Sequence, residues 1–249
     1  MTANSMLARA RRDLGMRGRP NPVTRWYANR QGSAFLRAPW CNMAVTRWAV
    51  ESGNYAAVCF GTDYAYTVWH AQRFQRAGRW YWGASGARPG DIVFFDWGGS
   101  NSISRIDHVG IVEANLGGGR LQTIEGNTSD ACLRRVRSGN VIVGYGRPDY
   151  TNSGTGGNTM VGLKEGDKGE EVKELQTSLR HAGFGHLLGN YGPRGDGVDG
   201  EYGAGTSKAV LACRKWVGSS AKSGKTVSGS AAAQIRRAVA RREAERAAK

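Results

Sequence analysis

The chain has 249 residues, of which 40% are hydrophobic, and a formal net charge of +15 at pH 7. This length allows two domains or one large one. No window reaches the roughly 18 consecutive apolar residues of a membrane span, which excludes a membrane-inserted protein. Because basic residues outnumber acidic residues in both halves, the expected partner is anionic: a nucleic acid, a membrane surface or a cell wall.

The N-terminus and the cysteines limit the location and the chemistry. The first 20 residues are basic but lack the apolar core of a secretory signal, so we expect synthesis as a cytoplasmic protein. No two cysteines form a CxxC pair, which argues against a structural zinc site and a disulfide framework. The cysteines are Cys41, Cys59, Cys132 and Cys213. We expect a monomer that needs no metal and no cofactor.

Residues 1–149 begin with helical patterns and continue with strand patterns. The helical segments, whose apolar residues recur at helical spacing, are Ser5–Leu14, Cys41–Ser52 and Ala65–Ala77. The β-rich runs, which are short and separated by glycine-containing turns, are Asp91–Trp97, Asp107–Ala114, Arg120–Glu125 and Val141–Tyr145. Helices followed by consecutive strands predict an α+β domain in which N-terminal helices pack on an antiparallel sheet.

The second half of the chain has a different organisation. Residues 150–160 are polar and glycine-rich, which predicts a flexible linker between two domains. Residues 161–249 then show helical patterns and no strand pattern, so we expect a small three-helix domain there. The three predicted helices are Lys168–Ala182, Tyr202–Val217 and Ser230–Lys249.

Cys41 stands directly after Pro-Trp, at the predicted start of an amphipathic helix. The macrodipole and the unpaired N–H groups of a helix N-terminus stabilise a thiolate. A nucleophilic cysteine needs a base, and the base needs an orienting group. His108 opens one predicted strand, and Glu125 and Asn127 close the next one after a turn at Gly117–Gly119. Antiparallel pairing brings the start of one strand beside the end of the next, so these residues are expected to meet.

Four motifs in order carry a resemblance to a known family. They are PWCNMAVTRW, PGDIVFF, IDHVGIVEA and TIEGN, and they resemble the CHAP family of cysteine amidohydrolases and peptidases, which act on peptidoglycan and have a papain-like fold. The resemblance implies that Cys41 is the nucleophile, His108 the general base and Glu125 the group that orients the imidazole. Asn127 matches a polar residue of that family's active site. The implied mechanism is acyl transfer through a thioester, with backbone N–H groups near the helix start binding the oxyanion.

Other candidate residues are interpreted as structural. The remaining three cysteines are expected to be buried thiols, and His70 is expected to be a packed or surface histidine. Asp107 adjoins His108, but neighbouring strand residues point to opposite faces, so it is expected to be structural or to face solvent. His181 and His186 lie near Asp196, and we reject a metal site there because the spacing is loose.

The C-terminal half resembles the peptidoglycan-binding module built from three helices. The resemblance rests on G-x-x-V-x-x-L-Q and D-G-x-Y-G-x-x-T-x-x-A-V, which span most of residues 162–240. Cys213 and Arg214 depart from that pattern, and Gly189–Gly197 is a glycine-rich insertion. The alternative is a helical spacer or dimerisation domain. The arginine-rich end, Arg236–Lys249, is interpreted as a solvated helix face that assists binding to anionic wall polymers.

The combination is similar to a bacteriophage endolysin, which accumulates in the host cytoplasm and reaches the wall after the membrane has been permeabilised. The alternatives are a bacterial wall-remodelling hydrolase, an exported toxin, a binding-only protein with an inert catalytic domain, and a basic nucleic-acid-binding protein. No helix-turn-helix, zinc or RNA-binding motif supports the last of these. The scissile bond stays open between amidase and endopeptidase cleavage, and the loops expected to decide it are Gly98–Arg105 and Ala56–Tyr66.

Overall fold

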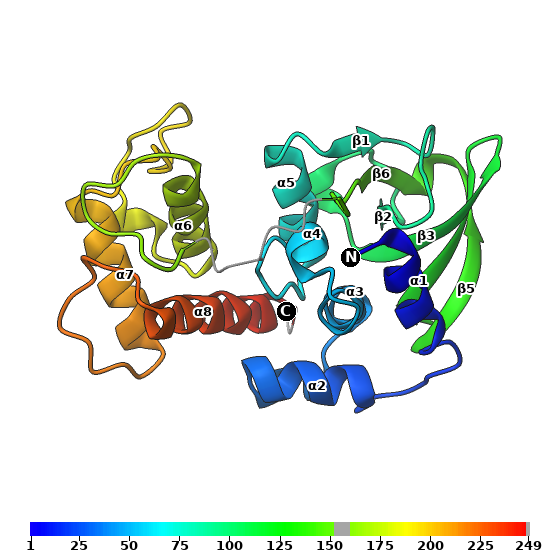
Figure 1. Ribbon diagram of the computed structural model, residues 1–249, viewed down its shortest axis with the longest axis horizontal. Coiled ribbons are helices and arrows are strands. Elements are labelled where there is room, and N and C mark those ends of the chain that lie inside the picture. The colour runs from blue at the N-terminus through cyan, green and yellow to red at the C-terminus, as the bar shows by residue number, and fades with distance from the viewer. Residues whose placement is uncertain (152–159, 248–249) are drawn as a thin grey trace. The chain divides into compact units, whose positions relative to one another are not determined.

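The computed structural model describes residues 1–151 and 160–247. The chain divides into two compact units, Met1–Gly156 and Gly157–Lys249, which are drawn in Figure 1 and are described separately here. The division falls inside the stretch predicted as a linker, 150–160, of which residues 152–159 lie outside the described part of the chain.

Unit 1 opens with helices whose ends follow local capping rules. Thr2 and Ser5 form a capping box at the start of α1, and Asn21 caps α2 with Pro22 in its first turn, which satisfies backbone N–H groups that have no partner within the helix. The α-helices are α1 (Ala3–Arg11), α2 (Pro22–Gln31), α3 (Cys41–Glu51), α4 (Tyr55–Cys59) and α5 (Thr67–Arg76). The single 3-10 turns are η1 (Ser33–Arg37), η2 (Ile103–Arg105) and η3 (Gly139–Val141). The sequence predicted α1, α3 and α5 and missed α2 and α4.

The strands of unit 1 form one six-stranded sheet in the order β1-β6-β2-β3-β4-β5, and every neighbouring pair is antiparallel. They are β1 (Trp80–Trp82), β2 (Ile92–Phe95), β3 (His108–Gly117), β4 (Arg120–Thr128), β5 (Ala131–Arg137) and β6 (Ile142–Gly146). The predicted α+β class with an antiparallel sheet is confirmed. The two edge strands, β1 and β5, were not predicted.

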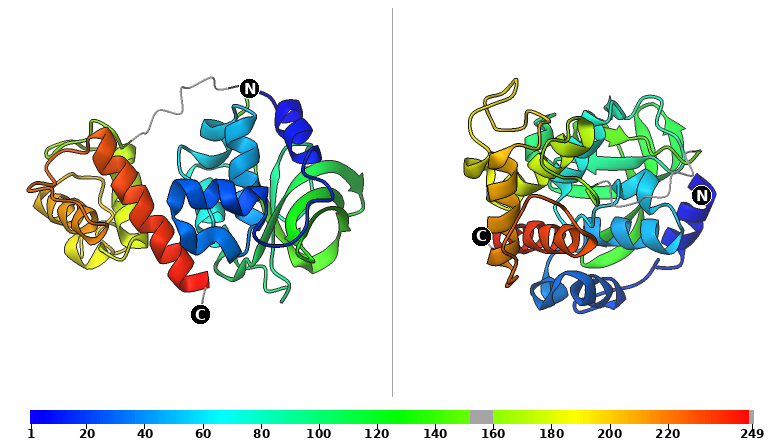
Figure 2. Two further views of the ribbon diagram at one scale, coloured as in Figure 1. Left: turned by 90° about the horizontal axis from the view of Figure 1, so that it is seen from below. Right: turned by 60° about the vertical axis from the view of Figure 1, so that its left-hand side comes forward.

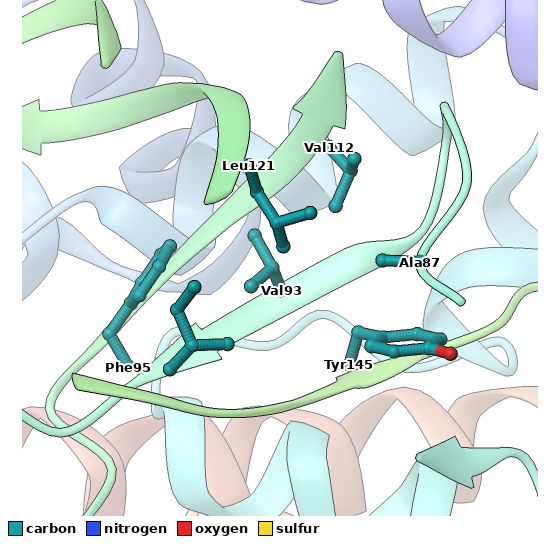
Figure 3. Packing of buried hydrophobic residues seen from close by; sticks show 7 residues of the cluster. Ala87, Val93, Phe95, Val112, Leu121 and Tyr145 are labelled. Atoms are coloured by element: carbon teal, nitrogen blue, oxygen red, sulfur yellow. The ribbon is translucent and has the colours of Figure 1, made fainter. Parts of the chain in front are cut away.

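Apolar side chains from four strands form a core cluster on the sheet, shown in Figure 3. Its members are Ala87, Val93, Phe95, Val112, Leu121, Ile142 and Tyr145. Each is at most 4% exposed, and burying one of the larger side chains, such as Leu121 or Phe95, contributes about 1.5–3 kcal/mol before the entropy of ordering it is subtracted. This packing fixes the position of the strands in the sheet, including the start of β3.

Helix α3 packs directly on β3 and β4, and Figures 1 and 2 show the helices of unit 1 against the strands. Val45 and Trp48 are fully buried and anchor α3. Gly126 of β4 is required by this approach, because a Cβ atom there would lie 2.7 Å from the Ala44 Cβ and 3.1 Å from the Trp40 ring. The start of α3 is therefore held tightly beside the end of β4.

Unit 2 contains α6 (Glu170–His181), the 3-10 turn η4 (Gly185–Leu187), α7 (Ala204–Trp216) and α8 (Gly229–Ala247). The three α-helices contact one another, and Val172, Leu175 and Leu179, which the sequence placed on one face of α6, are fully buried. Arg241 and Arg242 of α8 lie 4.2 and 4.6 Å from the Trp216 ring centre, and Arg241 is nevertheless exposed. Among the described residues, no helix is long and apolar enough to span a membrane.

Candidate active site

Cys41 is the first residue of α3. Trp40 occupies the N-cap position, and among the described residues no side chain caps this helix end. The N–H groups of the first turn therefore point outward without a side-chain acceptor, and together with the macrodipole they favour negative charge at this place. Cys41 is 5% exposed. A substrate can therefore reach its thiol only through this small exposed part of the residue.

His108 and Glu125 come together across the β3–β4 hairpin. The register pairs Ile111 with Ile124, which places the first residue of β3 near the last residues of β4. His108 Nε2 lies 3.0 Å from Glu125 Oε2. Gly110 makes room for this pair, because a Cβ atom there would lie 2.8 Å from Glu125 Cγ.

The Cys41 thiol is close enough to the imidazole of His108 to raise the pKa of that ring. Because Nε2 contacts Glu125, Nδ1 is the nitrogen left for Cys41. Burial acts to lower the pKa of His108, but the hydrogen bonds with Cys41 and Glu125 outweigh burial and raise this pKa to about 9. A histidine with such a pKa is protonated at neutral pH, as a thiolate–imidazolium pair requires.

Glu125 is fully buried and its carboxylate oxygens are saturated with donors. Arg137 of β5 donates from Nε to Oε1 at 2.9 Å and from Nη2 to Oε2 at 2.7 Å, and Thr123 Oγ1 donates to Oε1 at 2.7 Å. Burial acts to raise the pKa of Glu125, but the hydrogen bonds from Arg137 and His108 outweigh it and hold this pKa at about 2. The carboxylate stays ionised.

Arg137 is a site residue that the sequence reasoning missed. It belongs to β5, an edge strand with the sequence ACLRRVR. Along this strand the side chains alternate between more and less exposed only from Leu133 onward. The signal that could have found it is the strand-spaced pair Arg135 and Arg137, because strand residues two apart point to the same face of the sheet.

Asn127 differs from the other three predicted residues in its contacts. It has a positive φ of 59°, and the β4–β5 register is irregular between Glu125 and Thr128. Its side chain is half-buried, and within the described residues no hydrogen bond joins it to Cys41, His108 or Glu125. The structure thus brings three of the four predicted residues into one series, Cys41–His108–Glu125.

An aromatic wall borders the imidazole. The rings of Phe95 and Trp97 lie 5.8 and 5.4 Å from the His108 ring, centre to centre, and Arg137 lies over the Trp97 ring at 4.7 Å. Trp97 is 45% exposed. The loop that follows it is held by Asp96, which accepts hydrogen bonds from the N–H groups of Gly98 and Ser100, each at 2.8 Å. An exposed indole is therefore fixed beside the site.

The residues interpreted as structural are not part of the Cys41–His108–Glu125 series. Cys59, Cys132 and Cys213 are fully buried, and burial raises the pKa of each thiol. Asp107 is exposed and accepts a hydrogen bond from the Trp97 N–H at 3.3 Å. Among the described residues, no group of three or more His, Cys, Asp or Glu side chains could hold a metal ion.

His70 is fully buried. Of the two environments predicted for it, packed or at the surface, the structure shows the packed one. Its Nδ1 lies 2.9 Å from Asn42 Oδ1 and its Nε2 lies 2.9 Å from the Val58 carbonyl. Burial lowers the pKa of His70 to about 4, so the ring is neutral and can donate only one of these hydrogen bonds. The buried Asn42 Nδ2 atom has no partner. Exchanging the positions of the Asn42 amide oxygen and nitrogen lets Nδ2 donate to His70 Nδ1.

A thiol at a helix start, an imidazole and a buried carboxylate in series can perform nucleophilic attack on a carbonyl carbon followed by proton transfer to a leaving group. The comparisons agree with this chemistry. The model of the CHAP domain family matches residues 26–127, a span that includes Cys41, His108, Glu125 and Asn127. No curated protein and no solved structure matches the chain. Unit 1 therefore contains a CHAP domain at residues 26–127.

Proposed function

We propose that the protein is a peptidoglycan hydrolase that cleaves an amide bond of the bacterial cell wall, with Cys41 as nucleophile, His108 as general base and acid, and Glu125 as the orienting acid. The observation that carries the proposal is the series Cys41–His108–Glu125 inside a CHAP domain. Asn127 is proposed as a further polar residue of the site, at the end of β4.

The reaction proceeds by acyl transfer. The Cys41 thiolate attacks the amide carbonyl carbon, and N–H groups at the start of α3 stabilise the oxyanion. The C–N bond breaks as the His108 imidazolium gives its proton to the leaving amine, which leaves a thioester. Water then gives a proton to His108 and attacks the thioester, releasing the carboxylic acid and restoring the thiolate–imidazolium pair.

The experiment that tests the catalytic assignment is Cys41→Ala. We expect the variant to lose clearing of purified cell walls while keeping the wild-type far-UV circular dichroism spectrum. Mass spectrometry of the wild-type digest then identifies the bond. A new L-alanine amino terminus indicates cleavage between muramic acid and L-alanine, and other new amino termini indicate an endopeptidase. Wild-type clearing rates in the alanine variant would contradict the proposal.

For unit 2 we propose binding to the wall. A cavity of about 340 Å³ lies at the uncapped start of α7 and is lined by Gln176, Tyr191, Asp199, Thr206 and their neighbours. Gln176 is 1% exposed and bonded to Asp199 Oδ1 at 2.7 Å, while Tyr191 is 69% exposed. Such a polar floor with an aromatic edge suits a sugar or peptide of the wall. The arginine-rich end of α8 is proposed to add affinity for anionic wall polymers.

The test of wall binding uses the full chain carrying Cys41→Ala, so that the wall stays intact. We expect Tyr191→Ala to reduce the fraction of protein that sediments with walls, and higher salt to reduce it further. Unchanged sedimentation of the tyrosine variant would contradict a binding role for the cavity, and insensitivity to salt would contradict the electrostatic contribution.

For the biological role we propose a phage endolysin that accumulates in the host cytoplasm and acts on the wall after membrane permeabilisation. The joining of a hydrolytic unit to a second compact unit supports this role. The alternatives are a bacterial wall-remodelling hydrolase and an exported toxin, and the genes beside its own would separate them. Salt-dependent DNA binding without wall lysis would instead favour a nucleic-acid-binding protein, which the net charge of +15 suggested.

A further inference from the structure

Glu125 is shared between two cationic groups. His108 Nε2 contacts Oε2 at 3.0 Å, and Arg137 binds both oxygens at 2.9 and 2.7 Å. Arg137 is itself held in place, because Nη2 also donates to Thr128 Oγ1 at 3.1 Å and the guanidinium lies over the Trp97 ring. The orienting carboxylate is therefore held by Arg137 as well as by His108, and both contact Oε2.

The other groups around this pair do not carry a fixed positive charge. His108 faces Cys41 from α3 and the rings of Phe95 and Trp97. Asp107 directly precedes β3 and is exposed. Glu125 interacts with Thr123 of its own strand and electrostatically with the buried Cys132 of β5. An arginine stays protonated throughout the working pH range, so Arg137 supplies the constant positive charge.

A carboxylate bound only to His108 would stabilise the imidazolium with its full charge. The histidine must nevertheless release its proton to the leaving amine in every turnover, and proton transfer is fastest when the pKa of the acid lies near the working pH. A guanidinium on the same carboxylate withdraws part of that stabilisation. Its positive charge also attracts the negative charge that the attacking sulfur carries.

We propose that Arg137 is a positioning residue that shares the Glu125 carboxylate with His108 and thereby sets the pH range in which the Cys41–His108 pair is charged. The inference rests on the proposed roles of Cys41 and His108. It is tested first without any wall substrate, by the pH dependence of Cys41 alkylation with iodoacetamide, so that its failure is distinguishable from failure of the proposed hydrolysis. Cys41→Ala gives the background from the buried cysteines.

Two substitutions of Arg137 in the full chain test the proposal, and a third variant serves as the control. Arg137→Gln removes the charge and keeps polar length, and it should move the acidic limb of the alkylation profile to higher pH by about one pH unit. Both limbs of kcat/KM for wall hydrolysis should move in the same direction. Arg137→Lys keeps the charge but loses the two-point contact, and it should move the limbs in the same direction by less than half as much.

The matched control is Arg134→Gln. Arg134 lies on the same strand and binds Glu113 instead, so it removes an arginine–carboxylate pair without touching Glu125, and its profile should coincide with that of the wild type. A role limited to holding β5 in place would lower alkylation and hydrolysis at every pH and move no limb. Unmoved limbs in Arg137→Gln, or limbs moved to lower pH, would overturn the proposal. If Arg137→Gln does not fold, limbs that move to lower pH in Arg137→Lys overturn the proposal.

Discussion

Unit 1 buries two histidines with opposite properties. His108 is 6% exposed and its pKa is raised to about 9, whereas His70 is fully buried and its pKa is lowered to about 4. Burial acts in the same direction on both, because removal from water disfavours the charged ring. The difference therefore comes from the partners of each ring.

The partners of His108 can carry negative charge, and those of His70 cannot. His108 lies between the Cys41 thiol and the Glu125 carboxylate. His70 contacts an amide and a backbone carbonyl, and its ring stacks on Tyr64 with centres 4.5 Å apart. A candidate general base is thus recognised by an ionised partner in addition to its burial.

The largest expected effect comes from removing the charged histidine. His108→Ala should lower kcat/KM for wall hydrolysis by about 10³-fold or more, because both proton transfers lose their carrier. The matched variant at the other site, His70→Phe, should stay within about tenfold of the wild type per folded molecule. Initial rates of wall clearing, corrected for folded fraction, measure both. A comparable loss in the two variants would break the distinction between these histidines.

The next effect tests the partner of His108. Glu125→Gln keeps the shape of the side chain and removes its charge, so the pKa of His108 should fall from about 9 toward the ordinary histidine value near 6.5. The alkaline limb of kcat/KM should move down with it, and the rate at neutral pH should fall by about 10²-fold. An NMR titration of the His108 ring measures the shift. An unchanged titration midpoint would mean that Glu125 does not set this charge.

Much of this site was predictable from the sequence, for physical reasons that the two histidines illustrate. His108 opens an apolar run that pairs through a glycine turn with the run ending in Glu125, and these short-range signals predict the hairpin. They do not predict its final register, which two irregularities between the strands shift. His70 was ambiguous, since a helix pattern indicates a face but not what covers it. Its covering comes from α4 and from Asn42 at the start of α3.

The parts that were missed lie where local patterns are weak. Strand β5 is an edge strand with three arginines in seven residues, and charged side chains are common on edges because they discourage further pairing. Its charges hid both the strand and Arg137. Helix α4 spans only five residues, too few to show a helical period. The family resemblance supplied the roles of the catalytic residues, and the clamp on Glu125 required the three-dimensional structure.

A stability measurement sharpens the comparison further. Because the pKa of His70 is about 4 in the folded protein and near 6.5 in an unfolded chain, the unfolded state binds more protons between these values. The free energy of unfolding should therefore fall as the pH drops from about 6.5 to 4, by up to about 1.4 kcal/mol per pH unit. His70→Phe should flatten this slope and should also destabilise the protein by about 2 kcal/mol, since Asn42 and the Val58 carbonyl lose their partner.

Urea unfolding followed by tryptophan fluorescence at several pH values checks this, because every tryptophan except Trp216 lies in unit 1. His108 should give no matching slope on the alkaline side of neutrality. In the proposed ion pair, the proton that His108 gains is one that Cys41 has given up, so folding leaves the number of bound protons unchanged. A slope between about pH 6.5 and 5.5 that persists in His70→Phe would contradict the assignment of that proton to His70, because the lowered pKa of Glu125 adds its own slope at lower pH.

The smallest expected effect concerns the surroundings of the two rings. The aromatic neighbours of His70 are buried, with Phe74 and Phe94 fully so, whereas Trp97 beside His108 is 45% exposed. An exposed indole fixed next to a reacting group offers its face to substrate. Trp97→Ala should therefore raise KM for soluble wall fragments several-fold and leave kcat and the pH limbs nearly unchanged, since the hydrogen bonds that join Arg137 to Glu125 and Thr128 stay in place. Tyr81→Ala, at an exposed aromatic of β1, is the control and should change neither constant. A fall in kcat with unchanged KM in the tryptophan variant would show that the indole supports the imidazole rather than the substrate.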